Sequence, residues 1–367
     1  MNAYRPRKIY VDRAVAHCAL TREIIARLPD TPVEEVADPD ALVAYFQRQP
    51  NSHTEGKRYL LLTEKKGPFL KSCPGTKNYR CCNYYNLNIS SNCPIECSYC
   101  FLQFYLNNPM MVVYANTERI ADELEEVLRA NDKGFFRVGT GELTDSLVLD
   151  DLTRFTQLLV PLFARHKNAI LELKTKTVNV DHLLDLAPSG RVMISWSMNA
   201  RHICETEEHK SATLDERLDA AARCAKHGYR VGFHFDPMIY YKDWETGYRE
   251  TLDLIFSRIP AKQVCWISLG SLRFPASLKD VIARRFPNSP IIYEELVPTP
   301  DGKLHYFQPI REEMYEKMRG WMKEIAPEVV TYLCMESMDV WERLFGEAPE
   351  TDDELGRRLD AAAARCA

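Results

Sequence analysis

The stretch Cys93-Pro-Ile-Glu-Cys97-Ser-Tyr-Cys100 places three thiols within a single short segment. The three and two intervening residues let one loop fold around a soft metal centre, because thiolates are the ligands that zinc and iron–sulfur clusters prefer. A closed structural zinc site takes four ligands. Three cysteines therefore favour an iron–sulfur cluster with one iron left open, whereas zinc would need Cys73, Cys81 or Cys82 as a fourth ligand.

Short strand-like runs alternate with helical stretches after position 84. The expected strands are Tyr85–Ile89, Phe135–Gly139, Ala169–Lys174, Arg191–Trp196, Arg230–Phe235 and Gln263–Leu269. The expected helices between them are Glu118–Arg129, Asp150–Arg165, Val180–Leu186, Thr213–Lys226 and Trp244–Arg258. Six such alternations predict parallel strands with crossover helices, as in an α/β barrel or a partial barrel. In these folds the chemistry lies at the carboxyl ends of the strands.

Two flanking regions have a different layout, so we predict three segments with bounds 1–83, 84–270 and 271–367. The first is an α+β region, with a strand at Lys8–Val11, helices at Val15–Leu28 and Asp40–Arg48, and a hairpin formed by Tyr59–Thr63 and Pro68–Lys71. The last has a hairpin from Ile291–Leu296 to Leu304–Phe307, a helix at Arg311–Ile325, a strand at Val329–Cys334 and a helix from Asp339. The pair Asp301-Gly302 is a good hairpin turn.

Composition limits the class of protein. The chain has 367 residues, 46% of them hydrophobic, and a net charge of −5, which predicts a globular protein rather than a disordered one or one that coats nucleic acid. No apolar run is long enough for a membrane span or a signal peptide, so we expect a cytoplasmic protein without a membrane partner. Twelve cysteines in a reducing compartment favour metal or redox work for those that cluster.

The three cysteines followed by Phe101 resemble the cluster motif of the radical S-adenosylmethionine (SAM) superfamily. That resemblance implies a [4Fe–4S] cluster held by Cys93, Cys97 and Cys100, whose open iron chelates SAM. It also implies reductive cleavage of SAM to a 5′-deoxyadenosyl radical, which abstracts hydrogen from a substrate. The protein would position and shield this radical, while the cofactors supply the hard chemistry.

Further segments resemble the spore photoproduct lyase family, and the similarity extends over roughly residues 80–345. They are Cys93–Leu102, Lys176–Leu184, Ile194–Asn199, Gly232–Pro237, Leu272–Phe274 and Leu333–Ser337. This resemblance implies an α/β fold with a partial (β/α)6 TIM-type radical SAM barrel, an N-terminal α+β region and a C-terminal extension containing a β-hairpin. It implies lyase-type repair of a thymine photoproduct in DNA, with damaged DNA as a partner and a reductant such as flavodoxin or ferredoxin.

The resemblance also suggests residues that bind SAM. Lys176 would pair with its carboxylate and Ser197 would hydrogen-bond its amino acid or ribose; the alternatives are a solvated lysine and an ordinary strand hydroxyl. Gly139-Thr140-Gly141-Glu142 resembles the Gly-Gly-Glu stretch of many radical SAM enzymes, where Glu142 would accept from the SAM ammonium. An ordinary strand-end turn is the alternative for this stretch. Thr144 and Asp145 are weaker neighbours.

Two departures from the family weigh against an unchanged mechanism. The family carries a hydrogen-donating cysteine in the loop after the second strand, where this chain has Glu142, or Leu143 if the alignment slips by one residue. Of the two family tyrosines around the last cluster cysteine, Tyr99 is kept as a catalytic candidate, but the second is Phe101. The candidates for a replacement donor are Cys204, Cys265 and Cys334, each of which could instead be a buried thiol.

The cysteines upstream of the motif are a separate feature. Adjacent Cys81 and Cys82 point opposite ways in an extended chain, so both are not expected to bind one metal. Cys73 with Cys81 or Cys82 could have a redox or second-metal role. The alternative is packing against the barrel entrance.

Candidate DNA contacts lie near the C-terminal hairpin. Arg273 begins a basic stretch, and the hairpin offers Lys303, His305 and Tyr306, which suit phosphate contact and stacking beside an extruded base. Solvated charges or hairpin core would explain the same residues. Two rival functions remain: the same SAM chemistry on a small metabolite or peptide, and a non-catalytic iron–sulfur or zinc protein that binds DNA.

Overall fold

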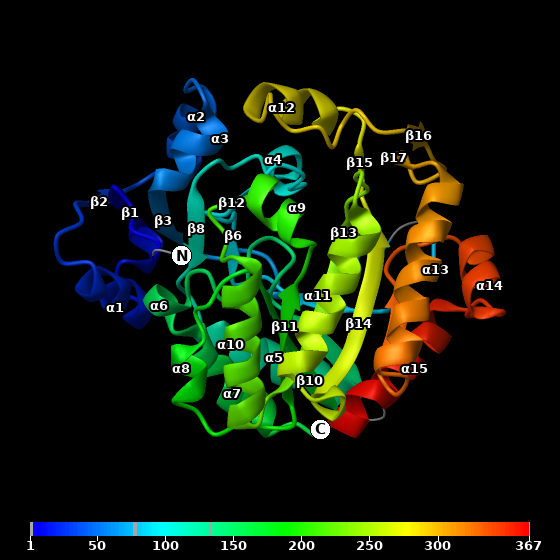
Figure 1. Cartoon of the computed structure of the whole chain (residues 1–367). Coiled ribbons are helices and arrows are strands. Elements are labelled where there is room, and N and C mark those ends of the chain that lie inside the picture. Colours follow the sequence, from blue (N-terminus) through cyan, green and yellow to red (C-terminus); the bar gives the residue numbers. More distant parts are fainter. Residues whose placement is uncertain (1–2, 76–78, 132–133, 367) are drawn as a thin grey trace.

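A curled sheet of eight strands forms the centre of the molecule (Figure 1). The computed structural model describes residues 3–75, 79–131 and 134–366. The strand order is β18-β14-β13-β11-β10-β9-β5-β4. Their bounds are β4 Leu70–Ser72, β5 Tyr85–Leu87, β9 Phe136–Gly139, β10 Ala169–Thr175, β11 Val192–Ser197, β13 Arg230–Met238, β14 Val264–Ser271 and β18 Val330–Leu333. Neighbours from β5 to β18 are parallel, and β4 is antiparallel to β5. The predicted α/β partial barrel is confirmed.

Crossover helices cover the outside of the sheet. They are α5 Glu118–Ala130, α6 Asp150–Thr153, α7 Phe155–Ala164, α8 Asp181–Leu184, α10 Leu214–His227 and α11 Trp244–Arg258. In α10 a capping box between Thr213 and Glu216 satisfies the first turn, and an apolar stripe is buried against the strands. The single helix predicted over Asp150–Arg165 is wrong in one respect, because Arg154 adopts a left-handed conformation and separates α6 from α7.

A second sheet lies on the N-terminal side, with the order β2-β1-β3-β8-β6. Its strands are β1 Lys8–Asp12, β2 Val33–Val36, β3 Tyr59–Thr63, β6 Ser90–Ser91 and β8 Met111–Tyr114, flanked by α1 Ala19–Arg27, α2 Pro39–Gln47 and α3 Ser52–Glu55. The predicted hairpin of Tyr59–Thr63 with Pro68–Lys71 is wrong. Strand β3 pairs in parallel with β1 and β8, and β4 joins the central sheet. Leu60, Leu61 and Leu62 are all buried, as is typical of a central strand covered on both faces.

The first part of the C-terminal segment lies above the carboxyl ends of the barrel strands, and its last helices run along the side of the barrel toward the opposite end (Figure 1). Strand β14 leads into β15 Arg273–Pro275, which pairs with the hairpin of β16 Leu296–Pro298 and β17 Lys303–Tyr306. The predicted hairpin is present, but its first strand begins only at Leu296. The helices of this segment are α12 Leu278–Arg285, α13 Gln308–Ile325, α14 Met338–Phe345 and α15 Asp352–Cys366.

The three predicted segments exchange strands. Strand β4 comes from residues 1–83 and β18 from residues 271–367, yet both belong to the barrel sheet. Strands β6 and β8 lie in the predicted barrel segment but complete the N-terminal sheet. The predicted boundaries stay a prediction. Within the described ranges, no helix has both the length and the apolar character that crossing a membrane requires.

Candidate active site

The loop with the three cysteines follows β5 and reaches the carboxyl ends of the barrel strands. It contains the short strand β7 (Glu96–Cys97) and leads into α4 (Leu102–Tyr105). Strand β7 pairs with β12 (Glu208–His209), so that Cys97 lies opposite Glu208. Cys93 and Cys97 are buried, with 8% and 7% of their surface exposed, and Cys100 is half-buried. The loop therefore holds two buried thiols and a third, Cys100, that is more accessible.

Contacts from distant segments fix the loop. The Asn92 Oδ1 accepts from the backbone N–H of Cys93 at 2.8 Å, and the Lys57 Nζ donates to the carbonyl of Ile95 at 3.1 Å. Arg285 of α12 donates to the carboxylate of Glu96 at 2.7 Å. The basic stretch before the hairpin thus contributes one arginine to holding the cysteine loop.

A buried carboxylate, Glu208, supports the loop from behind. It accepts a hydrogen bond from the hydroxyl of Tyr99 and forms ion pairs with Lys176 at 3.2 Å and Arg217 at 2.5 Å. Burial alone would raise the pKa of Glu208, but the charges of Arg217 and Lys176 hold it well below its usual range. Tyr99 and Lys176 therefore have a protein partner in this arrangement.

The loop after β9 brings the predicted Gly141, Glu142 and Thr144 beside the cysteine loop. The Glu142 carboxylate accepts from the Asn88 Nδ2 at 3.0 Å, and the carbonyl of Leu143 accepts from the Asn92 N–H at 2.8 Å. Thr144 is buried. The loop is thereby tied to the end of β5.

Asp145 ties the same loop to β10. Its carboxylate accepts from the Lys176 N–H and from the hydroxyl of Thr175, both at 2.7 Å. Burial raises the pKa of Asp145. Ser197, the last residue of β11, is 9% exposed, and its carbonyl accepts from Arg217 at 3.0 Å. The predicted SAM residues therefore gather at the ends of three adjacent strands, next to the cysteines.

Sequence analysis missed a polar cluster inside the barrel. Glu172 of β10 accepts from the Tyr84 hydroxyl at 2.6 Å, the Ser195 hydroxyl at 2.5 Å and the His234 Nε2 at 2.7 Å. Burial raises the pKa of Glu172, but the neighbouring His234 and the three hydrogen bonds bring it to about 2. Gly139 is required here, since a Cβ would lie 2.2 Å from the Tyr84 oxygen. The sequence signal for this cluster was one titratable residue inside each of two otherwise apolar strands, Glu172 in β10 and His234 in β13.

The predicted DNA contacts are mostly engaged within the protein. Arg273 pairs with Asp236 at 3.1 Å and has a 9% exposed side chain. The His305 Nε2 lies 3.1 Å from the Asp301 carboxylate, which also pairs with Lys303, and the buried Tyr306 hydroxyl accepts from the Tyr240 N–H. The structure does not bring these four residues to one exposed surface. Their part in DNA binding stays a prediction.

The replacement hydrogen donors are differently placed. The thiol of Cys204 is buried and donates to the Asn199 carbonyl at 3.5 Å. Cys265 is disulfide-bonded, so its sulfur carries no hydrogen. Cys334 is half-buried at the end of β18, and its sulfur lies 3.9 Å from an Arg273 nitrogen.

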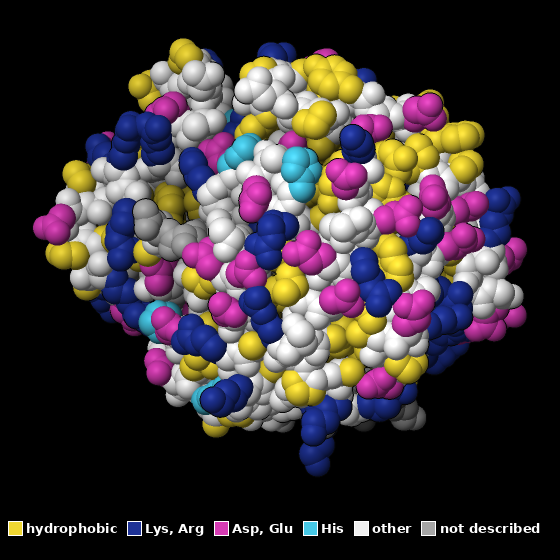
Figure 2. Space-filling view, viewed as in Figure 1, with side chains coloured by type: hydrophobic (Ala, Val, Ile, Leu, Met, Phe, Trp, Pro, Cys, Tyr) yellow, Lys and Arg dark blue, Asp and Glu magenta, His cyan; other side chains and the backbone are white. Residues whose placement is uncertain are grey.

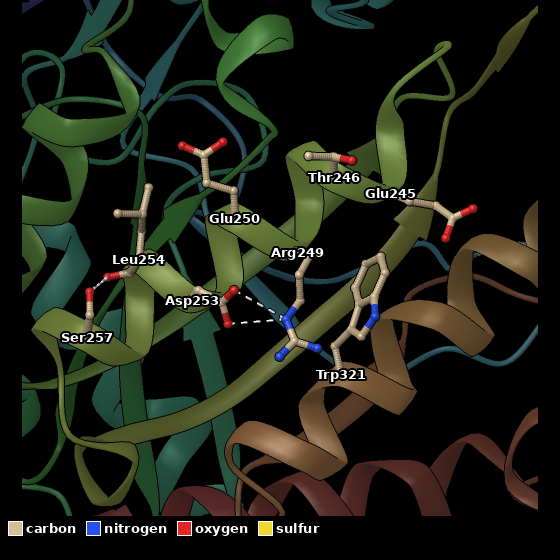
Figure 3. Close-up of a pocket in the computed structure, with 8 residues that line it drawn as sticks. All are labelled: Glu245, Thr246, Arg249, Glu250, Asp253, Leu254, Ser257 and Trp321. Carbon is tan, nitrogen blue, oxygen red and sulfur yellow. Dashed lines mark hydrogen bonds and ion pairs between the residues drawn. The ribbon is translucent and has the colours of Figure 1, made fainter.

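Surface charge gives no dominant phosphate-binding face in this view. Figure 2 shows lysine, arginine and acidic side chains interspersed across the visible face. A groove on the outside, lined by α11 residues and Trp321 of α13, is shown in Figure 3. There Arg249 points to Asp253, with which it pairs at 3.2 Å. The groove lies on the outer helices rather than at the strand ends, so it is not part of the candidate site.

The donors of the cysteine loop are of the type that an iron–sulfur cluster takes. They are three thiols, and the charge of Cys100 adds to the burial that raises the pKa values of Cys93 and Cys97. Within residues 3–75, 79–131 and 134–366, no group of three or more His, Cys, Asp or Glu side chains is arranged to hold one metal ion.

A partial barrel with three cysteines on the loop after its first parallel strand defines an enzyme of the radical SAM class. A model of the family described as "Spore photoproduct lyase" matches residues 51–332. The chain belongs to the spore photoproduct lyase family.

Individual proteins that resemble this chain are spore photoproduct lyases. The chain is 28% identical to the spore photoproduct lyase of Bacillus subtilis over 58% of its own length and 63% of that protein, so the match spans under two thirds of this relative. It is 27% identical to the Geobacillus enzyme over 66% of this chain and 74% of the relative. A solved structure of a spore photoproduct lyase variant with bound AdoMet and dinucleoside spore photoproduct has a TM-score of 0.78 at 21% identity, and covers 90% of this chain and 100% of that one. The last likeness shows the shared fold.

Proposed function

We propose that this chain is a radical SAM enzyme that repairs a thymine photoproduct in DNA. Cys93, Cys97 and Cys100 would hold a [4Fe–4S] cluster, and the loops after β9, β10 and β11 would hold SAM. When bound, the cluster and SAM supply a 5′-deoxyadenosyl radical. The observation that carries the proposal is the meeting of these loops with the cysteine loop in a member of this family. The protein is proposed to act in the cytoplasm, on damaged DNA, with flavodoxin or ferredoxin as the class of reductant.

The residues around the cofactors would orient SAM and shield the radical from solvent. A Cβ at Gly141 would lie 3.3 Å from the Ser146 hydroxyl oxygen, so glycine lets this loop pack closely against the neighbouring chain. The Glu142 carboxylate, held by Asn88, would accept from the SAM ammonium. Lys176 lies over the ring of Tyr99 at 5.8 Å and pairs with Glu208, so it would position Tyr99 as well as meet the SAM carboxylate. Ser197, at the end of β11, would donate a hydrogen bond to SAM or accept one from it.

The hairpin is the proposed DNA contact. Phe307 is 48% exposed immediately after β17, and Lys303 lies on the same strand, with a side chain that is 27% exposed. An exposed ring could stack on an extruded base, and the lysine could approach a phosphate. Arg273, His305 and Tyr306 would then hold the hairpin in place rather than touch the base.

The test is anaerobic turnover of reconstituted protein with SAM, dithionite and a synthetic spore-photoproduct dinucleotide. Chromatography would quantify 5′-deoxyadenosine and released thymidylyl-thymidine together. Both products from the wild-type protein and neither from Cys97→Ala would support the proposal. Failure of the wild-type protein to form 5′-deoxyadenosine would overturn it.

The second candidate function is the same chemistry on a different substrate. The carboxylate of Glu142 and the ring of Phe101 favour it, because they replace groups on which the family mechanism relies. Steady formation of 5′-deoxyadenosine without release of the dinucleotide would select this candidate.

A further inference from the structure

Two polar side chains beside the loop after β9 have hydrogen-bonding atoms without a partner in the part of the chain that the structure describes. The ammonium of Lys174, near the end of β10, forms no hydrogen bond or ion pair there. The Oδ1 of Asn88, directly after β5, is buried and accepts no hydrogen bond. A buried acceptor without a partner costs free energy, so a ligand that supplies the missing donor would be stabilised.

Strand alternation places the Lys174 side chain inside the barrel. Glu172, two residues earlier on β10, faces the interior, where it accepts from Ser195 and His234. Side chains two residues apart on a strand share a face, so Lys174 also faces the interior, nearer the carboxyl end. Its backbone is fixed there, because its N–H donates to the Ser146 hydroxyl and its carbonyl accepts from the Ser146 N–H, both at 3.0 Å.

The lysine side chain lies along the loop after β9. A Cβ at Gly141 would be 3.5 Å from the Cβ of Lys174 and 3.6 Å from its Cε. Both ends of the aliphatic stem therefore pass the same glycine. The half-buried lysine is thus held against this loop instead of extending into solvent.

Asn88 reaches the same loop from the other side. Strand β5 runs parallel to β9, and Asn86 pairs with Gly139, the last residue of β9. Asn88, two residues further on, therefore lies beyond the carboxyl end of β9. Its Nδ2 donates to the Glu142 carboxylate at 3.0 Å, which leaves its Oδ1 for another donor. Because β9 lies between β5 and β10 in the sheet, Asn88 and Lys174 flank the loop from opposite sides.

The other cations at these strand ends already have protein partners. Lys176 pairs with Glu208 at 3.2 Å, and Arg273 pairs with Asp236 at 3.1 Å. Each of these charges is largely neutralised before any ligand binds. Lys174 is different, since its charge is held inside the barrel without a carboxylate beside it.

We propose that Lys174 and Asn88 bind the edge of one pyrimidine ring of the substrate. The Lys174 ammonium donates to a ring carbonyl oxygen, and the Asn88 Oδ1 accepts from the adjacent ring N–H. This inference rests on the proposed function and adds the two residues that recognise the base.

The chemistry of the two groups matches this edge. A thymine ring carries an N–H between two carbonyl groups, so a donor and an acceptor stand side by side. An ammonium offers only donors, and an amide oxygen offers only acceptor sites. Enzymes that act on a base taken out of the stack read it by hydrogen bonds to this same edge. A phosphate would satisfy Lys174 but has no N–H for Asn88.

The experiment is binding of a synthetic dinucleoside spore photoproduct to the reconstituted holoenzyme with SAM and without reductant, measured by anaerobic titration calorimetry. Lys174→Met should raise the Kd for the dinucleoside at least about tenfold, because a charged hydrogen bond is lost. The Kd for SAM should stay within about twofold. Lys174→Arg keeps the charge and should restore most of the affinity. Lys226→Met, on the exposed end of α10, is the matched control and should bind as wild type.

A second measurement changes the ligand instead of the lysine. Two analogues, each methylated at N3 of one ring, lack one ring N–H. We expect one of them to bind wild type at least about tenfold more weakly than the parent, and that difference should fall below about twofold in Asn88→Ala. Circular dichroism would check that each variant folds.

Several outcomes would overturn the pair. They are equal dinucleoside affinity in wild type and Lys174→Met, full affinity for both methylated analogues, and an unchanged methylation effect in Asn88→Ala. Weaker binding of the dinucleotide but not of the dinucleoside in Lys174→Met would also do so, because the lysine would then contact the phosphate. Absence of photoproduct binding to the wild-type holoenzyme would instead overturn the proposed function.

Discussion

Two groups of three cysteines flank β5, and the protein holds them in opposite ways. In the cysteine loop, Cys93 and Cys97 are buried, and the support comes from Glu208 and its cationic partners behind them. In the β4–β5 loop, Cys81 is buried, and its interaction with Cys73 and Cys82 lowers the pKa values of both of those thiols. The first group would bind an external centre, whereas the thiols of the second group shift one another's pKa values. The same residue type thus has different properties because its surroundings differ.

The largest expected effect comes from removing a cluster ligand. Cys97→Ala should lower bound iron from about four per chain to near zero after reconstitution, since a cluster needs its thiolates. Iron and sulfide assays with the ultraviolet–visible spectrum would measure it. Cys82→Ala provides the comparison and should keep its iron. Equal iron loss in both variants would mean that the two groups are not functionally distinct.

Breaking the support of the cysteine loop should destabilise the fold. Glu208→Gln leaves the fully buried Arg217 without its carboxylate, and an unpaired buried charge costs about 3–5 kcal/mol. Urea unfolding followed by circular dichroism would measure the change. Glu324→Gln removes a partner of Arg249 on the surface and should change little, because exposed pairs are screened by water. A similar loss in both variants would contradict a special role for Glu208.

Cys73 should react faster with an alkylating reagent than an ordinary thiol does. The hydrogen bond from Cys81 lowers the pKa of Cys73 to about 6, so its alkylation rate should rise with a midpoint near that pH. At neutral pH the greater thiolate fraction outweighs the weaker nucleophile, for a net gain of about fourfold over an ordinary thiol. Mass spectrometry of iodoacetamide-treated protein would follow each peptide. In Cys81→Ala the midpoint should move upward, and an unchanged midpoint would contradict the hydrogen bond.

The smallest effect is expected from Asn86→Ala. Asn86 also hydrogen-bonds to the Cys73 sulfur, but it contributes less to the lowered pKa than Cys81 does. The alkylation midpoint should therefore move upward by less than in Cys81→Ala. The same pH series would measure it, with far-ultraviolet circular dichroism to check the fold. A larger shift than in Cys81→Ala would reverse the assignment of the main partner.

Local patterns predicted most of the barrel. The strands at β9, β10, β11, β13 and β14 are β-rich runs between amphipathic helices, and their expected bounds differ from the observed ones by only a few residues. The C-terminal hairpin was recognisable from its Asp301-Gly302 turn. Partner choice was not recognisable, which is why β3 and β4 were wrongly joined. A strand's sequence tells how buried it is, but not which strand lies beside it.

The candidate site likewise contains residues that the sequence pattern specified and contacts that only the tertiary structure creates. Cys93, Cys97 and Cys100 are specified by spacing along one loop, since all three lie within a few residues of each other. The sequence pattern does not specify the partner of Lys176 and Tyr99. That partner is Glu208, which lies on β12, far along the chain from Tyr99, and reaches both residues because β12 pairs with β7. The hairpin histidine and tyrosine looked suited to DNA, but packing against Asp301 and Tyr240 buries them.

The sequence by itself determined the thiol motif, the parallel α/β class and the turn of the hairpin, because each depends on residues close together in the chain. Only the tertiary structure decided that β18 extends the barrel and that Glu208 pairs with both Lys176 and Arg217. Both features depend on strand pairing between segments that are far apart in the chain. Such geometry arises from packing the whole chain, since burial and charge pairing act between segments that sequence separates.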